Sequence, residues 1–192
     1  MANICSDDLY FYSDSNPEGL QNLWEDIEAS INTSPTDAWI GRLFQCKGIP
    51  TTGICLYGTV TYKERNIDGI LLELSTAWSP LYDAYRTIAS HYKVSFVCRS
   101  IEPGVGIYFN TDTEGRFFPE EYMLSINDEN ELTPLGNKVC EVLEDWSLFS
   151  SSQEILDTFG RLGYDASSFD ELKMLLEEQD IYIHSFENPY GI

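Results

Sequence analysis

The sequence predicts an α+β protein with a full hydrophobic core. Of its 192 residues, 43% are apolar and 14% are aromatic, which is unlike the aromatic-poor composition of disordered acidic chains. Apolar residues recur at helical spacing after Asn16 and Pro17, whereas residues 54–78 form two strand-like runs around a tight turn. Because both patterns alternate along the chain, we expect a sheet covered by helices.

The first half of the chain is expected to contain strand, helix, strand, strand, helix and strand, in that order. Asn16 is predicted to cap the first helix and Pro17 to begin it, since both residue types favour these positions. Ser79 is likewise predicted to cap a second helix that begins at Pro80, directly after a strand that ends at Trp78. This order is that of a ferredoxin-like split βαβ sheet with helices on one face, here with extra strands.

The second half begins with strands and continues with helices. Residues 106–110 are strand-like and are expected to pair with residues 116–126 across a turn. Thr133 and Pro134 are predicted to begin the first of three helices, which a short strand follows. Val142 and Trp146 are among the apolar residues of that first helix.

Two domains are expected, and their charges differ. The first is the ferredoxin-like α+β domain over residues 1–126, and the second is an acidic, mainly helical extension over residues 127–192 that packs on it. The net charge of the chain is −21. Residues 1–101 carry 12 acidic and 7 basic side chains, whereas residues 102–192 carry 20 and 4. The second half therefore holds most of the excess negative charge.

This acidic half argues against nucleic acid and in favour of a protein partner. A negative surface repels phosphate groups, so direct binding of DNA or RNA is not expected. The same surface suits a basic protein partner, including one whose nucleic-acid-binding site it would occupy. Glu141, Glu144 and Asp145 are the candidate partner-binding residues. Solubility alone is the alternative explanation of the charge, and the sequence gives no indication of the oligomeric state.

A cytoplasmic location is expected. The first ten residues lack a basic region followed by an apolar stretch, and no apolar run approaches the ~18 residues that a membrane span needs. The five cysteines are odd in number and lack the spacing of zinc ligands. We therefore expect buried free thiols and no cofactor.

One segment matches the spacing of a calcium-binding loop. Asn110, Asp112, Glu114 and Glu121 occupy positions 1, 3, 5 and 12 of the EF-hand pattern. The flanking sequence does not match, since a strand precedes the segment and Pro119 interrupts the position of the second helix. An acidic turn is therefore expected, and no metal site is predicted.

Trp78 and Glu102 are the candidate ligand-binding residues. Each is expected near the end of a strand, where an aromatic ring beside a carboxylate can hold a small cationic or polar ligand. The simpler alternative is that Trp78 belongs to the core and Glu102 to a turn. No nucleophile has a recognisable base partner in the sequence, so an enzymatic activity is the less favoured interpretation.

Three segments of the chain, "MANICSDDLYFY", "STAWSPLYDAYRTIASHY" and "SIEPGVGIYFNTDTEG", resemble the YubB ferredoxin-like proteins of plasmids, phages and conjugative elements. That family begins with an Asn-x-Cys phrase and carries Thr-Ala-Trp-Ser-Pro-Pro before a helix, followed by a Glu-Pro-Gly turn. The resemblance covers about residues 1–126; Ile4 replaces a usual Trp, and Leu81 replaces the second Pro. It implies the ferredoxin-like fold and a mobile-element origin, and it implies no reaction.

Together these features predict a non-enzymatic accessory protein of a bacterial mobile element that binds a basic protein through its acidic surface. The alternative is a small-ligand binder or an enzyme with a pocket near Trp78 and Glu102.

Overall fold

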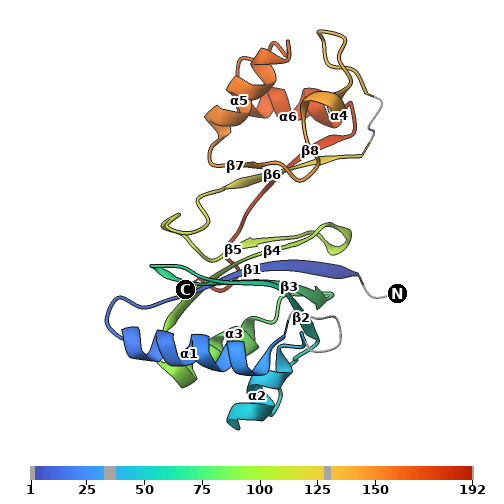
Figure 1. Cartoon of the computed structure of the whole chain (residues 1–192). Helices are drawn as coiled ribbons and strands as arrows, with labels where there is room; N and C mark the ends of the chain where they lie inside the picture. Colours follow the sequence, from blue (N-terminus) through green and yellow to red (C-terminus); the bar gives the residue numbers. More distant parts are fainter. Residues whose placement is uncertain (1–2, 33–37, 128–130, 192) are drawn as a thin grey trace. The chain divides into compact units, whose positions relative to one another are not determined.

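The chain forms two compact units (Figure 1). Unit 1 comprises Met1–Thr113 and Asn188–Ile192, and unit 2 comprises Glu114–Glu187. Unit 2 is thus inserted into unit 1, because the chain returns to unit 1 for its last five residues. The expected boundary after residue 126 lies inside unit 2. The computed structural model describes most of the chain, namely residues 3–32, 38–127 and 131–191.

Unit 1 contains a five-stranded sheet in the order β2-β3-β1-β4-β5, in which all neighbouring strands are antiparallel. The strands are β1 (Ile4–Tyr12), β2 (Gly58–Arg65), β3 (Gly69–Ala77), β4 (Ser95–Glu102) and β5 (Ile107–Asn110). The central strand is β1, in which Asp7 pairs with Leu74 of β3 and with Ser100 of β4. Opposite residues of antiparallel strands share a face, so these three side chains lie in one row across the sheet.

Three helices cover one face of this sheet: α1 (Pro17–Ser30), α2 (Gly41–Lys47) and α3 (Tyr82–Tyr92) (Figure 1). The core between the layers is apolar and includes Leu9 and Leu23. The predicted start of the first helix is confirmed. Asn16 Oδ1 accepts a hydrogen bond from the Gly19 N–H at 3.0 Å, and Pro17 is the first helical residue.

The predicted start of the second helix is wrong. The helix α3 begins at Tyr82, and the residue at its N-cap, Leu81, makes no side-chain capping bond. The carbonyl oxygen of Ser79 accepts a hydrogen bond from the Thr76 hydroxyl at 2.9 Å. Because Trp78 takes a left-handed conformation with a φ of 70°, a short loop follows the strand before the helix can start.

Unit 2 combines a three-stranded antiparallel sheet in the order β7-β6-β8 with three helices. The elements are β6 (Tyr122–Ile126), α4 (Val139–Val142), β7 (Leu148–Phe149), α5 (Ser152–Arg161), α6 (Phe169–Glu177) and β8 (Ile181–Ser185). Two serines cap the longer helices: the hydroxyl of Ser151 accepts from the Glu154 N–H, and that of Ser168 accepts from the Glu171 N–H, both at 3.2 Å. A separate apolar core includes the fully buried Phe159.

Two predictions for the second half are wrong. Residues 106–110 do not pair with residues 116–126, because β5 pairs with β4 whereas β6 pairs with β7 and β8. Thr133 and Pro134 lie in a turn closed by a β-bridge, and the helix that follows has four residues. Unit 2 is therefore a sheet with helices rather than a mainly helical extension.

Antiparallel sheets combined with separate helices make the chain an α+β protein, as predicted. In the described part of the chain, no helix has both the length and the apolarity needed to cross a bilayer.

The cysteines divide between the core and the surface. Cys5 and Cys98 are buried free thiols, whereas Cys46, Cys55 and Cys140 are free and exposed. The prediction of buried thiols is therefore wrong for three of the five. The reason is local, since Cys46 and Cys140 lie on the outer sides of short helices and Cys55 lies in a loop.

Candidate functional site

Trp78 lies directly after β3, and its side chain is 51% exposed. Its backbone has a φ of 70°, which residues with side chains rarely adopt, and its N–H donates to the Asn3 carbonyl oxygen at 3.0 Å. The prediction that Trp78 belongs to the core is therefore wrong. A large ring held at the surface on an unfavourable backbone marks a candidate functional position.

Glu102 is only 3% exposed, and its carboxylate closes a turn. The two oxygens accept hydrogen bonds from the Gly104 N–H at 3.2 Å and the Val105 N–H at 2.6 Å. These bonds cap the short 3-10 helix η1 (Pro103–Val105). Glu102 thus belongs to a turn, as the simpler alternative expected.

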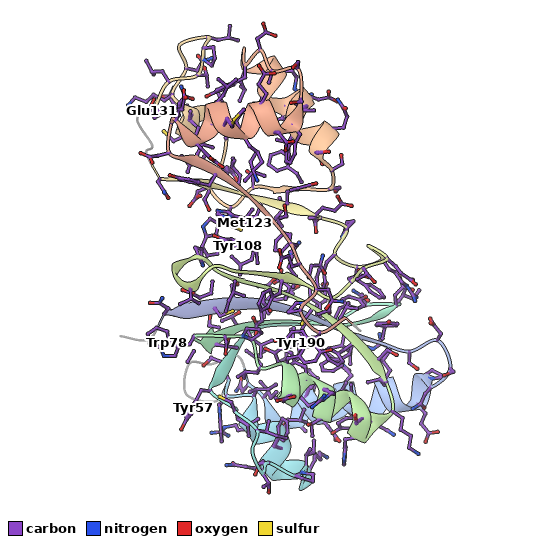
Figure 2. The ribbon with its side chains drawn as sticks, turned by 180° about the vertical axis from the view of Figure 1, so that it is seen from behind. Tyr57, Trp78, Tyr108, Met123, Glu131 and Tyr190 are labelled. Carbon is purple, nitrogen blue, oxygen red and sulfur yellow. The ribbon has the colours of Figure 1, made fainter. Side chains whose placement is uncertain are left out.

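Trp78 and the turn after Glu102 both contact Asn3, the residue before β1. Asn3 accepts the Trp78 hydrogen bond, and its side-chain amide packs against Gly104, where an added Cβ would lie 2.6 Å from Asn3 Nδ2. Tyr57 joins the same end of the sheet, since its carbonyl oxygen accepts from the Ala77 N–H at 3.2 Å (Figure 2). Four large apolar side chains are exposed at this end, each from a different segment: Ile4, Tyr57, Trp78 and Val105.

The segment with the calcium-loop spacing spans the point in the chain where the first part of unit 1 ends and unit 2 begins. Asn110 is the last residue of β5, and its Oδ1 accepts from the Asp112 N–H at 2.9 Å. Glu114 and Glu121 belong to unit 2, and no helix flanks the segment on either side. Among the described residues, no group of three or more His, Cys, Asp or Glu side chains is arranged to hold a metal ion.

The three predicted partner-binding acids of unit 2 differ in their contacts. Glu141 and Glu144 are exposed in and beside α4. Asp145 is also exposed, but its Oδ1 accepts a hydrogen bond from the Ile126 N–H at 2.9 Å. This bond gives the N–H of the last residue of β6 a partner. Glu141 and Glu144 therefore remain available to a partner, whereas Asp145 has a structural role.

Two apolar side chains accompany these acids at the surface. Trp146 is 42% exposed and Val142 is 39% exposed. Trp146 has a φ of 67°, and its N–H donates to the Leu124 carbonyl oxygen of β6 at 2.9 Å. The sequence predicts that Val142 and Trp146 lie on one longer helix. The helix α4 ends at Val142, so Trp146 lies outside it and its ring does not reach the core. We call the exposed set Glu141, Val142, Glu144 and Trp146 the α4 surface.

Sequence reasoning missed a buried polar cluster in unit 1. The carboxylate of Asp7 is fully buried and accepts hydrogen bonds from the Tyr85 hydroxyl of α3 and from the Cys5 thiol, the latter at 3.2 Å. Thr76 Oγ1 lies 3.4 Å from Asp7 Oδ2. Ser100, which faces Asp7 from β4, is buried, and its hydroxyl has no hydrogen-bond partner among the described residues.

The surroundings favour the protonated forms of this cluster. Burial raises the pKa of Asp7 above its ordinary value of 3.8, and burial beside Asp7 raises the pKa of Cys5 and of Tyr85. Burial, reinforced by the charge of Asp7, raises the pKa of Cys98 to about 12. Because the thiolate is the reactive form, both thiols are poor nucleophiles, and the cluster serves to hold α3 on β1.

Searches against protein-family models, curated proteins and solved structures returned no match to this chain.

Proposed function

We propose that the protein is a non-enzymatic interaction module that binds a basic protein partner through the α4 surface. The observation that carries this proposal is the exposure of Trp146 and Val142 beside Glu141 and Glu144. The buried core of unit 2 contains neither apolar side chain, so neither is needed to complete that core. An exposed tryptophan among charged residues is typical of an interface anchor.

The charge of unit 2 supports a basic partner. Residues 114–187 carry 18 acidic and four basic side chains, a net charge of −14. Such a surface attracts a basic partner over several ångströms and repels the phosphates of nucleic acids. A basic nucleic-acid-binding site on a cytoplasmic protein has the required charge, and the bound module would cover that site.

We further infer that unit 1 is a ferredoxin-like split βαβ domain. The chain order β1, α1, β2, β3, α3, β4 and the spatial order β2-β3-β1-β4 support this inference, with α2 and β5 as additions. The motifs at residues 76–80 and 102–104 support a relationship to the YubB proteins. They lie at one end of the sheet, on either side of Asn3. An accessory role in a bacterial mobile element follows from that relationship.

Reversal of the two available acids tests the interaction. We expect Glu141→Lys combined with Glu144→Lys to reduce capture of basic proteins from bacterial cytosol at 150 mM salt at least about tenfold, because the attraction becomes repulsion. The matched control is Glu25→Lys with Asp68→Lys, two exposed acids of unit 1 whose reversal changes the net charge equally. Quantitative mass spectrometry compares the captured proteins. If both double variants retain the same proteins as the wild type, the α4 surface is not the binding site.

A small-ligand site at the Trp78 end of unit 1 is the second candidate. It is favoured by the exposed ring of Trp78 and by a nearby pocket of about 360 Å³ that Trp39, Leu56 and Tyr57 help to line. Because the Glu102 carboxylate is engaged by the turn, such a ligand would be apolar or aromatic. Thermal-shift screening with aromatic compounds tests this site. A compound that stabilises the wild type and Trp78→Ala equally does not bind there.

A further inference from the structure

The last residues of the chain dock on unit 1 although unit 2 precedes them. The strand β8 ends at Ser185 in unit 2, and only two residues separate it from Asn188, where unit 1 resumes. Asn188 organises a tight turn: its Oδ1 accepts from the Tyr190 N–H at 3.1 Å, and its carbonyl oxygen accepts from the Gly191 N–H at 3.4 Å. We call residues 188–191 the tail.

A single aromatic side chain anchors the tail. The Tyr190 ring stacks on Tyr82 at the start of α3, with 3.6 Å between ring centroids and 5° between planes. It also meets Phe109 of β5 edge to face, at 6.2 Å and 85°. Phe96 of β4 packs against Tyr82 with 5.3 Å between centroids. We call Tyr82, Phe96 and Phe109 the aromatic groove, whose walls fit one flat ring.

The Tyr190 ring is only partly enclosed, and a pocket lies beside it at Tyr82. Burial raises the pKa of the Tyr190 hydroxyl to about 12, yet 38% of the residue stays exposed and its neighbours Pro189 and Gly191 are exposed as well. A pocket of about 320 Å³ continues beside the ring, with Tyr82, Asp83 and Arg86 among its lining residues. Tyr82 therefore borders both the ring of Tyr190 and a pocket that the tail leaves open.

We propose that the aromatic groove is a recognition site for a peptide segment of a partner protein that presents an aromatic side chain in a tight turn, and that the tail is its competing ligand in cis. The tail defines the chemistry of that segment: proline, an aromatic ring, then glycine. The pocket beside the ring has room for flanking residues, with Asp83 and Arg86 as polar contacts. This site lies in unit 1 and does not depend on the α4 surface.

Competition between the tail and the segment makes the proposal testable in the full chain. A tethered ligand acts at an effective concentration in the mM range, so an added peptide binds weakly while Tyr190 occupies the groove. The probe is a fluorescently labelled Glu-Asn-Pro-Tyr-Gly-Ile peptide, followed by anisotropy. We expect the Tyr190→Ala protein to bind it at least about tenfold more tightly than the wild type. A peptide with phenylalanine in place of tyrosine should bind within about threefold, because the contacts are made by the ring.

Two variants in the Tyr190→Ala background distinguish the groove from other surfaces. Tyr82→Ala should abolish peptide binding, whereas Tyr62→Ala, which removes an exposed tyrosine of β2 in unit 1, should not change it. Equal affinity of the wild-type and Tyr190→Ala proteins, or binding that does not depend on Tyr82, overturns the proposal. A concentration-dependent dimer of the wild type that Tyr190→Ala abolishes overturns it as well, because a second copy would then be the occupant.

Discussion

Unit 1 balances half of its acids with bases, whereas unit 2 leaves most of its acids unbalanced. Unit 1 carries 14 acidic and seven basic side chains, and its described residues form ion pairs between Asp26 and Lys47, Glu28 and Lys63, Asp83 and Arg86, and Asp8 and Arg99. Unit 2 has 18 acids and only four bases in fewer residues. Unit 2 thus carries a net charge of −14 of the total of −21, so recognition by charge can be tested there separately from the folding of unit 1.

The tryptophans sharpen this comparison. Trp24 of unit 1 is partly buried against the core, with Lys63 Nζ 6.0 Å from its ring centroid. Trp78 follows β3 in unit 1, and Trp146 precedes β7 in unit 2. Both residues are about half exposed, and both have a φ near 70°. Each unit therefore displays a left-handed tryptophan whose ring is about half exposed.

The largest expected effect on stability comes from removing one buried ring from the core of each unit. Phe44→Ala in unit 1 and Phe159→Ala in unit 2 each remove a buried ring and should lower the free energy of unfolding of that unit by about 3–5 kcal/mol. Hydrogen exchange followed by mass spectrometry resolves the two units by peptide. We expect faster exchange only in the unit that carries the substitution. Equal loss of protection in both units would show that they unfold as one.

The buried carboxylate of unit 1 predicts a pH dependence. Because burial raises the pKa of Asp7 in the folded protein, the stability tied to this group is fully present below its ordinary pKa of 3.8 and is lost as the pH rises through the folded-state value. A single proton contributes a slope of up to about 1.4 kcal/mol per pH unit. Asp7→Asn should remove this slope, so its stability relative to the wild type should increase as the pH rises above 3.8 and should level off above the folded-state pKa of Asp7.

Tyr85→Phe serves as the second variant of this test. It removes a hydrogen bond that favours the ionised carboxylate, so the pKa of Asp7 should rise further and the loss of stability should extend to higher pH. Urea unfolding at several pH values measures all three proteins. A constant difference between Asp7→Asn and the wild type at every pH would contradict the assignment.

Local signals in the sequence were sufficient for much of this fold. Asn16 and Pro17 mark the start of α1, and the serines before α5 and α6 mark theirs, because a cap and its helix are adjacent in the chain. The junction at Trp78 could not be read this way. A left-handed residue with a side chain is uncommon, so Ser79-Pro80 predicts a helix start although the helix begins two residues after Pro80, at Tyr82.

The candidate site was also only partly predictable from the sequence, because its contacts join segments that are far apart in the chain. Asp7 alternates with Cys5 and Leu9 on the buried face of β1, and this spacing was a usable signal that was missed. Its main partner, Tyr85, is 78 residues away, so the pairing itself was not predictable. The tail is similar: nothing in its sequence indicates that Tyr190 would stack on Tyr82.

The smallest expected effects concern the two exposed rings. Trp78→Ala and Trp146→Ala should each lower the free energy of unfolding by no more than about 1 kcal/mol, because about half of each ring is already in water. Glycine at either position should recover roughly that amount, since it adopts a φ near 70° without strain. Far-UV circular dichroism follows urea unfolding without relying on tryptophan fluorescence. Partner capture should separate the two positions, because Trp146→Ala removes the anchor of the α4 surface whereas Trp78→Ala leaves that surface intact. A loss of about 3 kcal/mol at Trp78 would mean that its ring supports the core after all, and equal capture by both alanine variants would mean that neither ring anchors the partner.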